Sequence, residues 1–185
     1  GYFRVAAVAP AVSVAGTDAN AEAIIQTAAV VAASGAELAV FPELSITAYT
    51  CGDLFHSSTL LNSARLALAK IITASASFPT MTMVVGMPLQ ANGMLFNCAV
   101  FLGAGRPVAV VPKTYLPNYN EFYEQRWFAS GEKSGAMPSE VELCGFNVPF
   151  GTDMIVSVDG GIVAADICED LWPPLPPSST LSLSG

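Results

Sequence analysis

The chain has 185 residues, of which 52% are hydrophobic and only 12% are charged. This composition is typical of an α/β domain with one large core and excludes a disordered or fibrous protein. The formal net charge is −8 and no cluster of Lys or Arg occurs, so we expect no nucleic-acid partner and no binding to anionic membranes. Because the sequence has neither a membrane-spanning apolar run nor a signal-peptide pattern at its start, it predicts a cytoplasmic protein.

The four cysteines, Cys51, Cys98, Cys144 and Cys168, are far apart in the sequence and form no C-x-x-C pair. Their spacing indicates neither a zinc site nor a disulfide framework, so we expect free thiols and no metal ion. The single histidine, His56, does not follow a predicted strand. A Cys/His catalytic pair is therefore disfavoured.

The first half of the chain has the rhythm of β-α-β units. Residues 3–10 and 36–43 are apolar runs that predict buried strands, and the segment 17–35 between them has apolar residues at helical spacing and ends in glycine. A second helix is predicted over 57–77, followed by a strand over 80–89. Consecutive units of this kind give parallel strands whose carboxyl ends lie at one edge of a sheet.

The second half changes to short strands. Residues 94–102 and 106–113 are apolar and are separated by Gly-Ala-Gly, which predicts a hairpin. The segment 117–128 is typical of a short helix or an ordered loop, and 141–151 of a strand. Residues 153–168 predict two strands joined across Asp-Gly-Gly. No last helix or strand follows to close a sheet, so we expect the chain to be a fragment of a larger protein.

Three of the apolar strand segments end in a residue that would be costly to bury alone: Glu43, Lys113 and Cys168. Together they supply a base, a cation and a nucleophile. A carboxylate can take the thiol proton, and an ammonium can stabilise a thiolate or the oxygen anion of a tetrahedral intermediate. Each residue on its own is more often structural, as a buried thiol or a salt-bridge partner.

Carboxylates surround the cysteine in the sequence, because Asp166, Glu169 and Asp170 all lie within two residues of Cys168. If they faced the sulfur they would raise the pKa of the thiol and weaken it as a nucleophile. We therefore expect that they point away or bind substrate, and that Lys113 supplies the charge that activates the thiol. The backbone N–H of Glu169 is a second candidate donor to the oxygen anion.

The segments around these three residues resemble a known family. "AVFPELSITAY", "VPKTYLPNYNEF" and "DICEDLW" are similar to the three signature blocks of the nitrilase or carbon–nitrogen hydrolase superfamily, in the same order. Within it, "TAYTCGDLF", "KTYLPNYNEFYEQRWF" and "ICEDLWPPLPPSS" resemble the glutamine-hydrolysing domain of the glutamine-dependent NAD⁺ synthetases. The resemblance covers nearly the whole chain, and the combination is far more specific than any one block.

The resemblance implies that residues 1–185 form an amidohydrolase domain, an α-β-β-α sandwich of two stacked mixed sheets flanked by helices, incomplete at its C-terminus. It implies hydrolysis of L-glutamine through a cysteine thioester, with no cofactor in this domain. The ammonia would pass to a synthetase domain of the same polypeptide, which would use ATP and Mg²⁺ to amidate nicotinic acid adenine dinucleotide. It also implies a homo-oligomer.

The resemblance also assigns roles to single residues. Glu43 would be the general base, Lys113 the cation that stabilises the oxyanion, and Cys168 the nucleophile. Glu121, eight residues after Lys113, would be an additional carboxylate that orients the ammonium and helps to place the substrate. Three further residues would lie near the glutamine side of the pocket: Tyr49, Tyr119 and Glu169. Ordinary rim packing for the tyrosines and a solvated surface position for the acidic residues are equally open readings.

Two features depart from the family pattern. Ala48 stands where the family commonly has glycine, and we expect the change to be tolerated, because a β-carbon is unfavourable there only if φ is positive. The chain also lacks the "SGG-x-DS" type of loop with which ATP-dependent amide synthetases bind pyrophosphate. This chain alone therefore cannot be expected to make NAD⁺.

Two other functions are open at this point. A stand-alone amidase or ω-amidase of the same superfamily would hydrolyse several small amides without a synthetase partner. A non-catalytic scaffold or oligomerisation module would use the same three residues as a buried ion pair and a silent thiol. Selective labelling of Cys168 by an electrophilic glutamine analogue distinguishes either enzyme from the scaffold.

Overall fold

The computed structural model describes residues 2–132, 137–158 and 161–184, and its centre is a five-stranded mixed sheet in the order β1-β2-β3-β4-β5. Its strands are β1 (Val5–Ala7), β2 (Leu38–Val40), β3 (Thr82–Ala91), β4 (Met94–Gly103) and β5 (Arg106–Pro112). The first three run parallel, whereas β3, β4 and β5 form an antiparallel meander. The predicted β-α-β units and the predicted hairpin after residue 94 are thereby confirmed.

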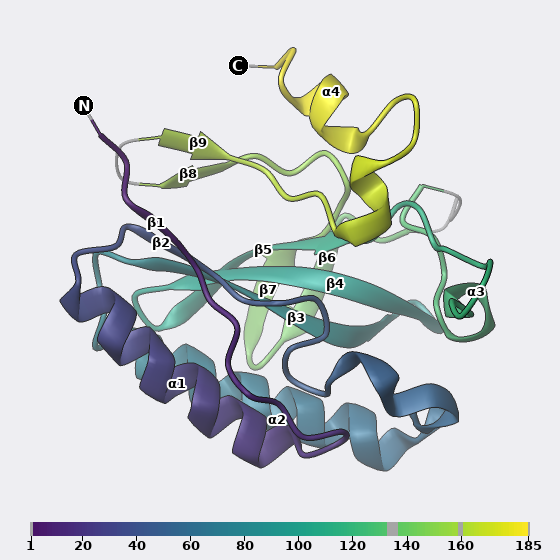
Figure 1. The fold of residues 1–185 in the computed structure, drawn as a ribbon, viewed down its shortest axis with the longest axis horizontal. Helices are drawn as coiled ribbons and strands as arrows, with labels where there is room; N and C mark the ends of the chain where they lie inside the picture. Colours follow the sequence, from purple (N-terminus) through teal and green to yellow (C-terminus); the bar gives the residue numbers. More distant parts are fainter. Residues whose placement is uncertain (1, 133–136, 159–160, 185) are drawn as a thin grey trace.

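Two helices, α1 (Thr17–Ala33) and α2 (Ser58–Ser75), cover one face of this sheet (Figure 1). The faces of β3 alternate as a pleated strand requires: Met83 and Val85 join the core under the helices, whereas Val84 faces the opposite side. Both sides of the strand are buried, which explains its nearly continuous apolar sequence. None of the helices in the described part of the chain is long and apolar enough to cross a membrane.

The other face of the sheet is covered by a hairpin of β8 (Val156–Val158) and β9 (Gly161–Val163), visible above the sheet in Figure 1. Val156 and Val158 pack there against apolar residues of the large sheet. The α/β class is confirmed. Of the second sheet expected for the sandwich, the described residues contain only this two-stranded layer, and the 3-10 helix η2 (Cys168–Leu171) and helix α4 (Pro177–Leu181) follow it.

The predicted strand over 141–151 is instead a second hairpin, β6 (Glu140–Leu143) and β7 (Phe146–Pro149). Cys144 and Gly145 have φ of 53° and 87°, the left-handed conformations of a tight hairpin turn. Cysteine is not a typical residue for the first position of such a turn, so Cys-Gly was not recognised as a turn sequence. The remaining elements are the 3-10 segment η1 (Tyr49–His56) and the short helix α3 (Glu124–Trp127).

Candidate active site

Glu43 lies on a tight turn after β2, and this turn sits directly on strand β3 at Gly86. The N–H of Ile46 donates to the carbonyl of Gly86 at 3.1 Å, and the N–H of Gly86 donates to Oγ of Ser45 at 3.1 Å. A β-carbon at Gly86 would lie 2.2 Å from the backbone nitrogen of Leu44. The absence of a side chain at Gly86 therefore allows the turn that carries Glu43 to approach the sheet.

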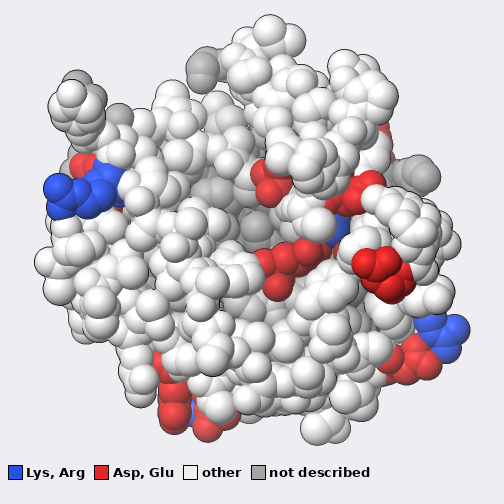
Figure 2. Space-filling model, in the orientation of Figure 1, with Lys and Arg blue, Asp and Glu red and all other residues white. Residues whose placement is uncertain are grey.

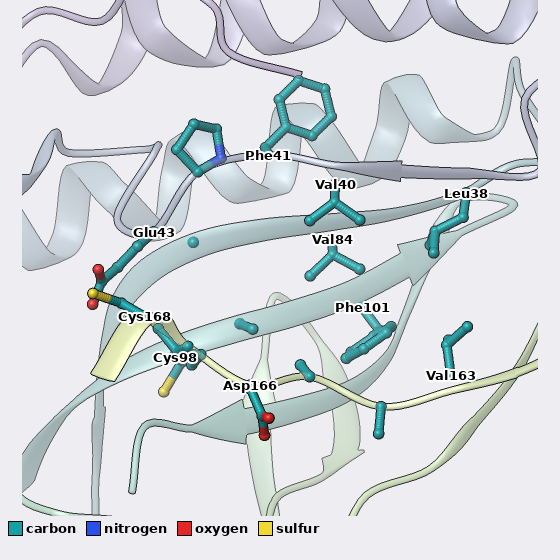
Figure 3. Close-up of a pocket in the computed structure, with 16 residues that line it drawn as sticks. Leu38, Val40, Phe41, Glu43, Val84, Cys98, Phe101, Val163, Asp166 and Cys168 are labelled. Carbon is teal, nitrogen blue, oxygen red and sulfur yellow. The ribbon is translucent and has the colours of Figure 1, made fainter. Parts of the chain in front are cut away.

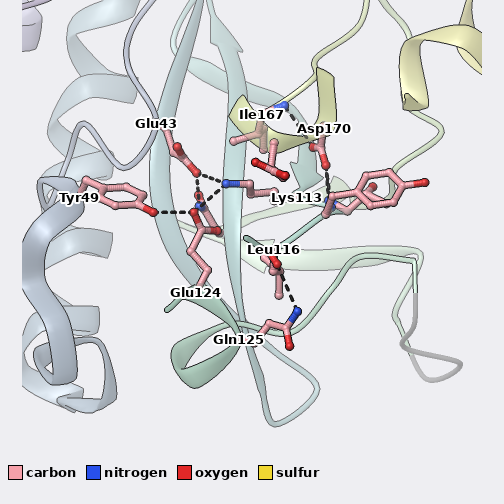
Figure 4. Close-up of polar contacts among 12 residues, drawn as sticks. Glu43, Tyr49, Lys113, Leu116, Glu124, Gln125, Ile167 and Asp170 are labelled. Atoms are coloured by element: carbon pink, nitrogen blue, oxygen red, sulfur yellow. Dashed lines mark hydrogen bonds and ion pairs between the residues drawn. The ribbon is translucent and has the colours of Figure 1, made fainter. Parts of the chain in front are cut away.

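Lys113 directly follows β5, and its backbone is fixed on both sides. Its N–H donates to the carbonyl of Asn97 at 2.8 Å, and its own carbonyl accepts from the N–H of Gly131 at 2.9 Å. The side chain is fully buried, and Nζ donates to Oε1 of Glu43 at 2.7 Å and to Oε1 of Glu124 at 2.8 Å (Figure 4). Burial alone would lower the pKa of Lys113, but the two carboxylates outweigh it and raise this pKa.

The second carboxylate at the ammonium is Glu124, so the prediction that Glu121 orients Lys113 is wrong. Glu121 is exposed in the loop before α3, whereas Glu124 is the first residue of α3 and is buried. The chain reverses direction in the loop after Lys113, so the carboxylate that reaches the Lys113 ammonium is that of Glu124, at the start of α3. Burial raises the pKa of Glu124, and the contact with Lys113 opposes that rise.

Tyr49 belongs to the same polar cluster. Its hydroxyl donates to Oε1 of Glu124 at 2.7 Å, so it contacts the second carboxylate (Figure 4). Burial and the neighbouring Glu124 raise the pKa of the Tyr49 hydroxyl, which keeps it a donor at neutral pH. Whether Tyr49 also contacts substrate remains a prediction.

Backbone strain accompanies Tyr49, because the preceding residue, Ala48, has φ of 67° and ψ of 157°. This region is accessible to glycine and costs other residues on the order of 1–3 kcal/mol. A β-carbon was expected to be unfavourable here only if φ is positive, and φ is positive, so alanine occupies this position under strain. The chain holds the conformation because Ala48 is buried at the entrance to η1.

Asn97 is a member of the site that sequence reasoning missed. It lies in the middle of β4, is buried, and its Nδ2 donates to Oε1 of Glu43 at 2.6 Å. The signal was present, because this is the only polar side chain in the strand sequence "MLFNCAVFLG". An amide in such an apolar strand is costly unless it is hydrogen-bonded, which marks it as a candidate site residue.

Cys168 is the first residue of η2, and its φ of 50° turns the chain sharply after the irregular segment 164–167. Non-glycine residues adopt such a left-handed conformation rarely, and such residues concentrate at functional sites. The cysteine is exposed and lines a cavity of about 220 Å³ together with Glu43. In Figure 3 the sulfur and the Glu43 carboxylate lie next to each other at one end of this cavity, whose walls include Val84 and Phe101.

Asp170 turns away from the sulfur and connects two loops of the site. Its Oδ1 accepts from the N–H groups of Thr114 and Tyr115 at 3.1 and 2.7 Å, and its Oδ2 accepts from the N–H of Ile167 at 3.1 Å. Burial raises the pKa of Asp170 to about 6, although these three donors oppose the rise. The segment after Lys113 is thereby held against the turn at Cys168.

The other two carboxylates near Cys168 also have partners of their own. Oδ1 of Asp166 accepts from the N–H of Ser178 at 3.1 Å. Both oxygens of Glu169 accept from the hydroxyl of Tyr119, at 3.0 and 2.9 Å. The expectation that these acidic groups point away from the sulfur or bind substrate stays a prediction, because Glu169 still raises the pKa of the thiol. The structure brings Tyr119 and Glu169 together next to Cys168 in the chain.

The thiol is nevertheless not activated in the resting site. Burial raises the pKa of Cys168, Glu43 raises it further, and Glu124 and Glu169 add smaller contributions, whereas Lys113 lowers it. Lys113 thus acts on the thiol in the predicted direction, but burial and the carboxylates outweigh its effect, and the charge of its ammonium is itself offset by two carboxylates. At neutral pH the thiol keeps its proton, so attack on a substrate requires a base in contact with it.

The surroundings of the site are acidic. Figure 2 shows Asp and Glu side chains around a hollow on this face, with no basic cluster beside it. Among the residues that the structure describes, no group of His, Cys, Asp and Glu side chains is arranged to hold a metal ion. The four cysteines are free thiols, as predicted.

An α/β sheet that gathers a cysteine, a lysine and two glutamates at one edge has the arrangement of a thiol-dependent amide hydrolase. The sequence model of the carbon-nitrogen hydrolases matches residues 4–180. The chain belongs to the carbon-nitrogen hydrolase family.

Longer proteins are similar to this chain over most of its length. The glutamine-dependent NAD(+) synthetase of Mycobacterium tuberculosis is 36% identical over 188 residues, which cover 100% of this chain and 27% of that protein. The structure of a glutamine-dependent NAD+ synthetase from Acinetobacter baumannii, in complex with ADP, matches 98% of this chain and 30% of its own, with a TM-score of 0.71 and 27% identity. That from Cytophaga hutchinsonii matches 90% of this chain and 28% of its own, with a TM-score of 0.79 and 24% identity. The chain thus spans less than a third of these relatives.

Proposed function

We propose that this domain hydrolyses L-glutamine to glutamate and ammonia through a thioester on Cys168. The observation that carries the proposal is the meeting of three groups from distant segments: Glu43 lies 2.7 Å from the ammonium of Lys113 and shares a cavity with the exposed thiol of Cys168. The names of the relatives, glutamine-dependent NAD(+) synthetases, support glutamine as the substrate.

In the first half of the reaction, Glu43 takes the proton of the Cys168 thiol while the sulfur attacks the side-chain amide carbon. A carbon–sulfur bond forms, and the carbonyl oxygen becomes an anion held by Lys113 and the backbone N–H of Glu169. When the carbon–nitrogen bond breaks, Glu43 returns the proton to the leaving nitrogen, and ammonia departs. Because the thiol is protonated at rest, thiol deprotonation and attack are coupled.

In the second half, Glu43 takes a proton from water, and the resulting hydroxide attacks the thioester. The carbon–sulfur bond breaks, the proton returns to the sulfur, and glutamate is released. Tyr119 and Glu169 are in contact beside the nucleophile, which supports a role for them at the amino-acid end of the substrate. Tyr49 and Glu121 remain further candidates for substrate contacts.

We further propose that the ammonia is used by a synthetase domain of the same polypeptide, which would amidate nicotinic acid adenine dinucleotide to NAD⁺ with ATP and Mg²⁺. The ADP bound to the Acinetobacter baumannii relative supports the use of an adenine nucleotide by the longer protein. Homo-oligomerisation and a cytoplasmic location remain predictions. Light scattering of the full-length protein would test the first of these.

The substitution Cys168→Ala in the full-length protein tests this division of labour. We expect glutamine-driven NAD⁺ synthesis to be abolished, whereas synthesis driven by added ammonium keeps its wild-type rate, because the thiol takes part only in the release of ammonia. Equal loss of both activities would contradict the proposal. Hydrolysis of many small amides without any glutamine-driven synthesis would instead support a stand-alone amidase.

A further inference from the structure

Asn97 is a buried amide with no obvious structural task. The rest of its strand, β4, is apolar apart from the terminal glycine, and the backbone carbonyl of Asn97 already accepts the hydrogen bond from the N–H of Lys113. Its side-chain Oδ1 is buried and has no hydrogen-bond partner among the described residues. Leaving such an acceptor unpaired costs free energy, so the amide requires a compensating role.

The single side-chain partner that the structure gives Asn97 is the proposed base. Nδ2 donates to Oε1 of Glu43 at 2.6 Å. The amide is oriented by this contact, because an ionised carboxylate only accepts hydrogen bonds and would repel Oδ1. Asn97 also lies on the same face of β4 as Ala99 and Phe101, which line the cavity that contains Cys168.

Both donors to Glu43 use the same oxygen. Oε1 accepts from Asn97 and from Nζ of Lys113, whereas Oε2 receives no hydrogen bond from the residues that the structure describes. The carboxylate is therefore fixed through one oxygen, and the other is free to accept a proton. Two donors on one oxygen define the plane of the carboxylate more tightly than a single donor would.

We propose that Asn97 is a positioning residue for the general base: its amide holds Oε1 of Glu43 and stabilises the ionised carboxylate, so that Oε2 takes the proton from Cys168. The inference rests on the proposed role of Glu43 as the base. The amide is uncharged, so it adds a donor to the carboxylate without adding a second cation beside the thiol.

Other charged and polar groups also surround the Glu43 carboxylate, and each comes from a different element. Lys113 contacts it from the end of β5, and Glu124 of α3 is joined to it through that ammonium. Tyr49 of η1 and Cys168 of η2 are close enough to interact electrostatically with its charge. None of these contacts is altered directly when only the side chain of Asn97 is changed.

Two variants of the full-length protein test the inference by separating kcat from KM in glutamine hydrolysis. Asn97→Ala removes the donor to Oε1 of Glu43, so we expect kcat to fall about 10- to 100-fold, whereas KM stays within about twofold of the wild-type value. Asn97→Asp removes the donor and places a second carboxylate beside Glu43, so kcat should fall at least as far as in Asn97→Ala.

A matched control in the same strand separates positioning from general destabilisation. Val100→Ala creates a cavity in the buried core of β4, and we expect a lower melting temperature with kcat close to the wild-type value. A wild-type kcat in Asn97→Ala would overturn the inference. An equal loss of kcat in Val100→Ala would overturn it as well.

A second readout keeps the inference separate from the choice of substrate. If the wild-type protein hydrolyses no glutamine, the proposed function fails, and the rate of Cys168 alkylation by chloroacetamide at pH 8 then tests Asn97. If Asn97 acts by holding Glu43, Asn97→Ala should change this rate in the wild-type background and leave it unchanged in the Glu43→Gln background. No change in the wild-type background, or an equal change in both backgrounds, overturns the inference.

Discussion

The contact between the Glu43 turn and strand β3 leads to a sharp prediction for Gly86→Ala. The new β-carbon would lie 2.2 Å from the nitrogen of Leu44, 2.6 Å from the carbonyl oxygen of Pro42 and 2.8 Å from the carbonyl carbon of Glu43. All three are backbone atoms, so no side-chain rotation relieves the overlap. Gly86 does not have a left-handed φ, so the clash is the whole effect of the substitution.

The size of the effect follows from these distances. To restore even a 3.0 Å contact, the turn must move about 0.8 Å away from the strand, and Glu43 moves with it. Misplacement of a reacting group by about 1 Å can cost on the order of 10²-fold in rate. The overlap also destabilises the fold by about 1–3 kcal/mol, as overpacking of a core typically does.

We therefore expect Gly86→Ala to lower kcat for glutamine hydrolysis about 100-fold and to lower the melting temperature by several degrees. Gly161→Ala in β9 is the matched control, because a β-carbon there has no atom of the described residues within 4 Å and that glycine also has no left-handed φ. Its activity should equal that of the wild type. Full activity of the Gly86→Ala variant would show that the close contact between the turn and β3 does not determine the position of Glu43.

Two further predictions concern the base and the strained alanine. Glu43→Gln should abolish glutamine hydrolysis but make alkylation of Cys168 by iodoacetamide at pH 8 faster, because the Glu43 carboxylate raises the pKa of the thiol. Mass spectrometry measures the alkylation rate, with Glu121→Gln as the control variant. Slower alkylation in Glu43→Gln would contradict the prediction. Ala48→Gly should raise the melting temperature, because glycine adopts the positive φ of this position without the strain of about 1–3 kcal/mol that alanine carries. An unchanged or lower melting temperature would show that the backbone at Ala48 is not strained.

Much of the fold followed from sequence periodicity. Helices α1 and α2 and strands β3, β4 and β5 all lie within a few residues of their predicted bounds, because long segments with a regular apolar pattern have one favourable way to be buried. The split of 141–151 into two strands was missed, because the turn depends on a left-handed cysteine rather than on a typical turn sequence.

The site residues that follow strands could be predicted from the sequence, whereas those that lie on loops could not. Glu43 follows β2 and Lys113 follows β5, and the two strands point in the same direction in one sheet, so both residues could be expected at the same edge of that sheet. Glu124 could not be distinguished from Glu121, because the loop between Lys113 and α3 has no periodic pattern that fixes its path. Asn97 was overlooked because a single amide in a strand belongs to no known sequence motif. The free-energy cost of burying an amide could still have marked it as a candidate site residue.

The enclosed ammonium has a chemical consequence for the proposed thioester. An acyl group on sulfur migrates readily to a neighbouring free amine and forms a stable amide, which would inactivate an enzyme that works through a thioester. Glu43 and Glu124 raise the pKa of Lys113, and a protonated amine has no lone pair with which to attack. In the proposed reaction, the two carboxylates would therefore protect Lys113 from acylation.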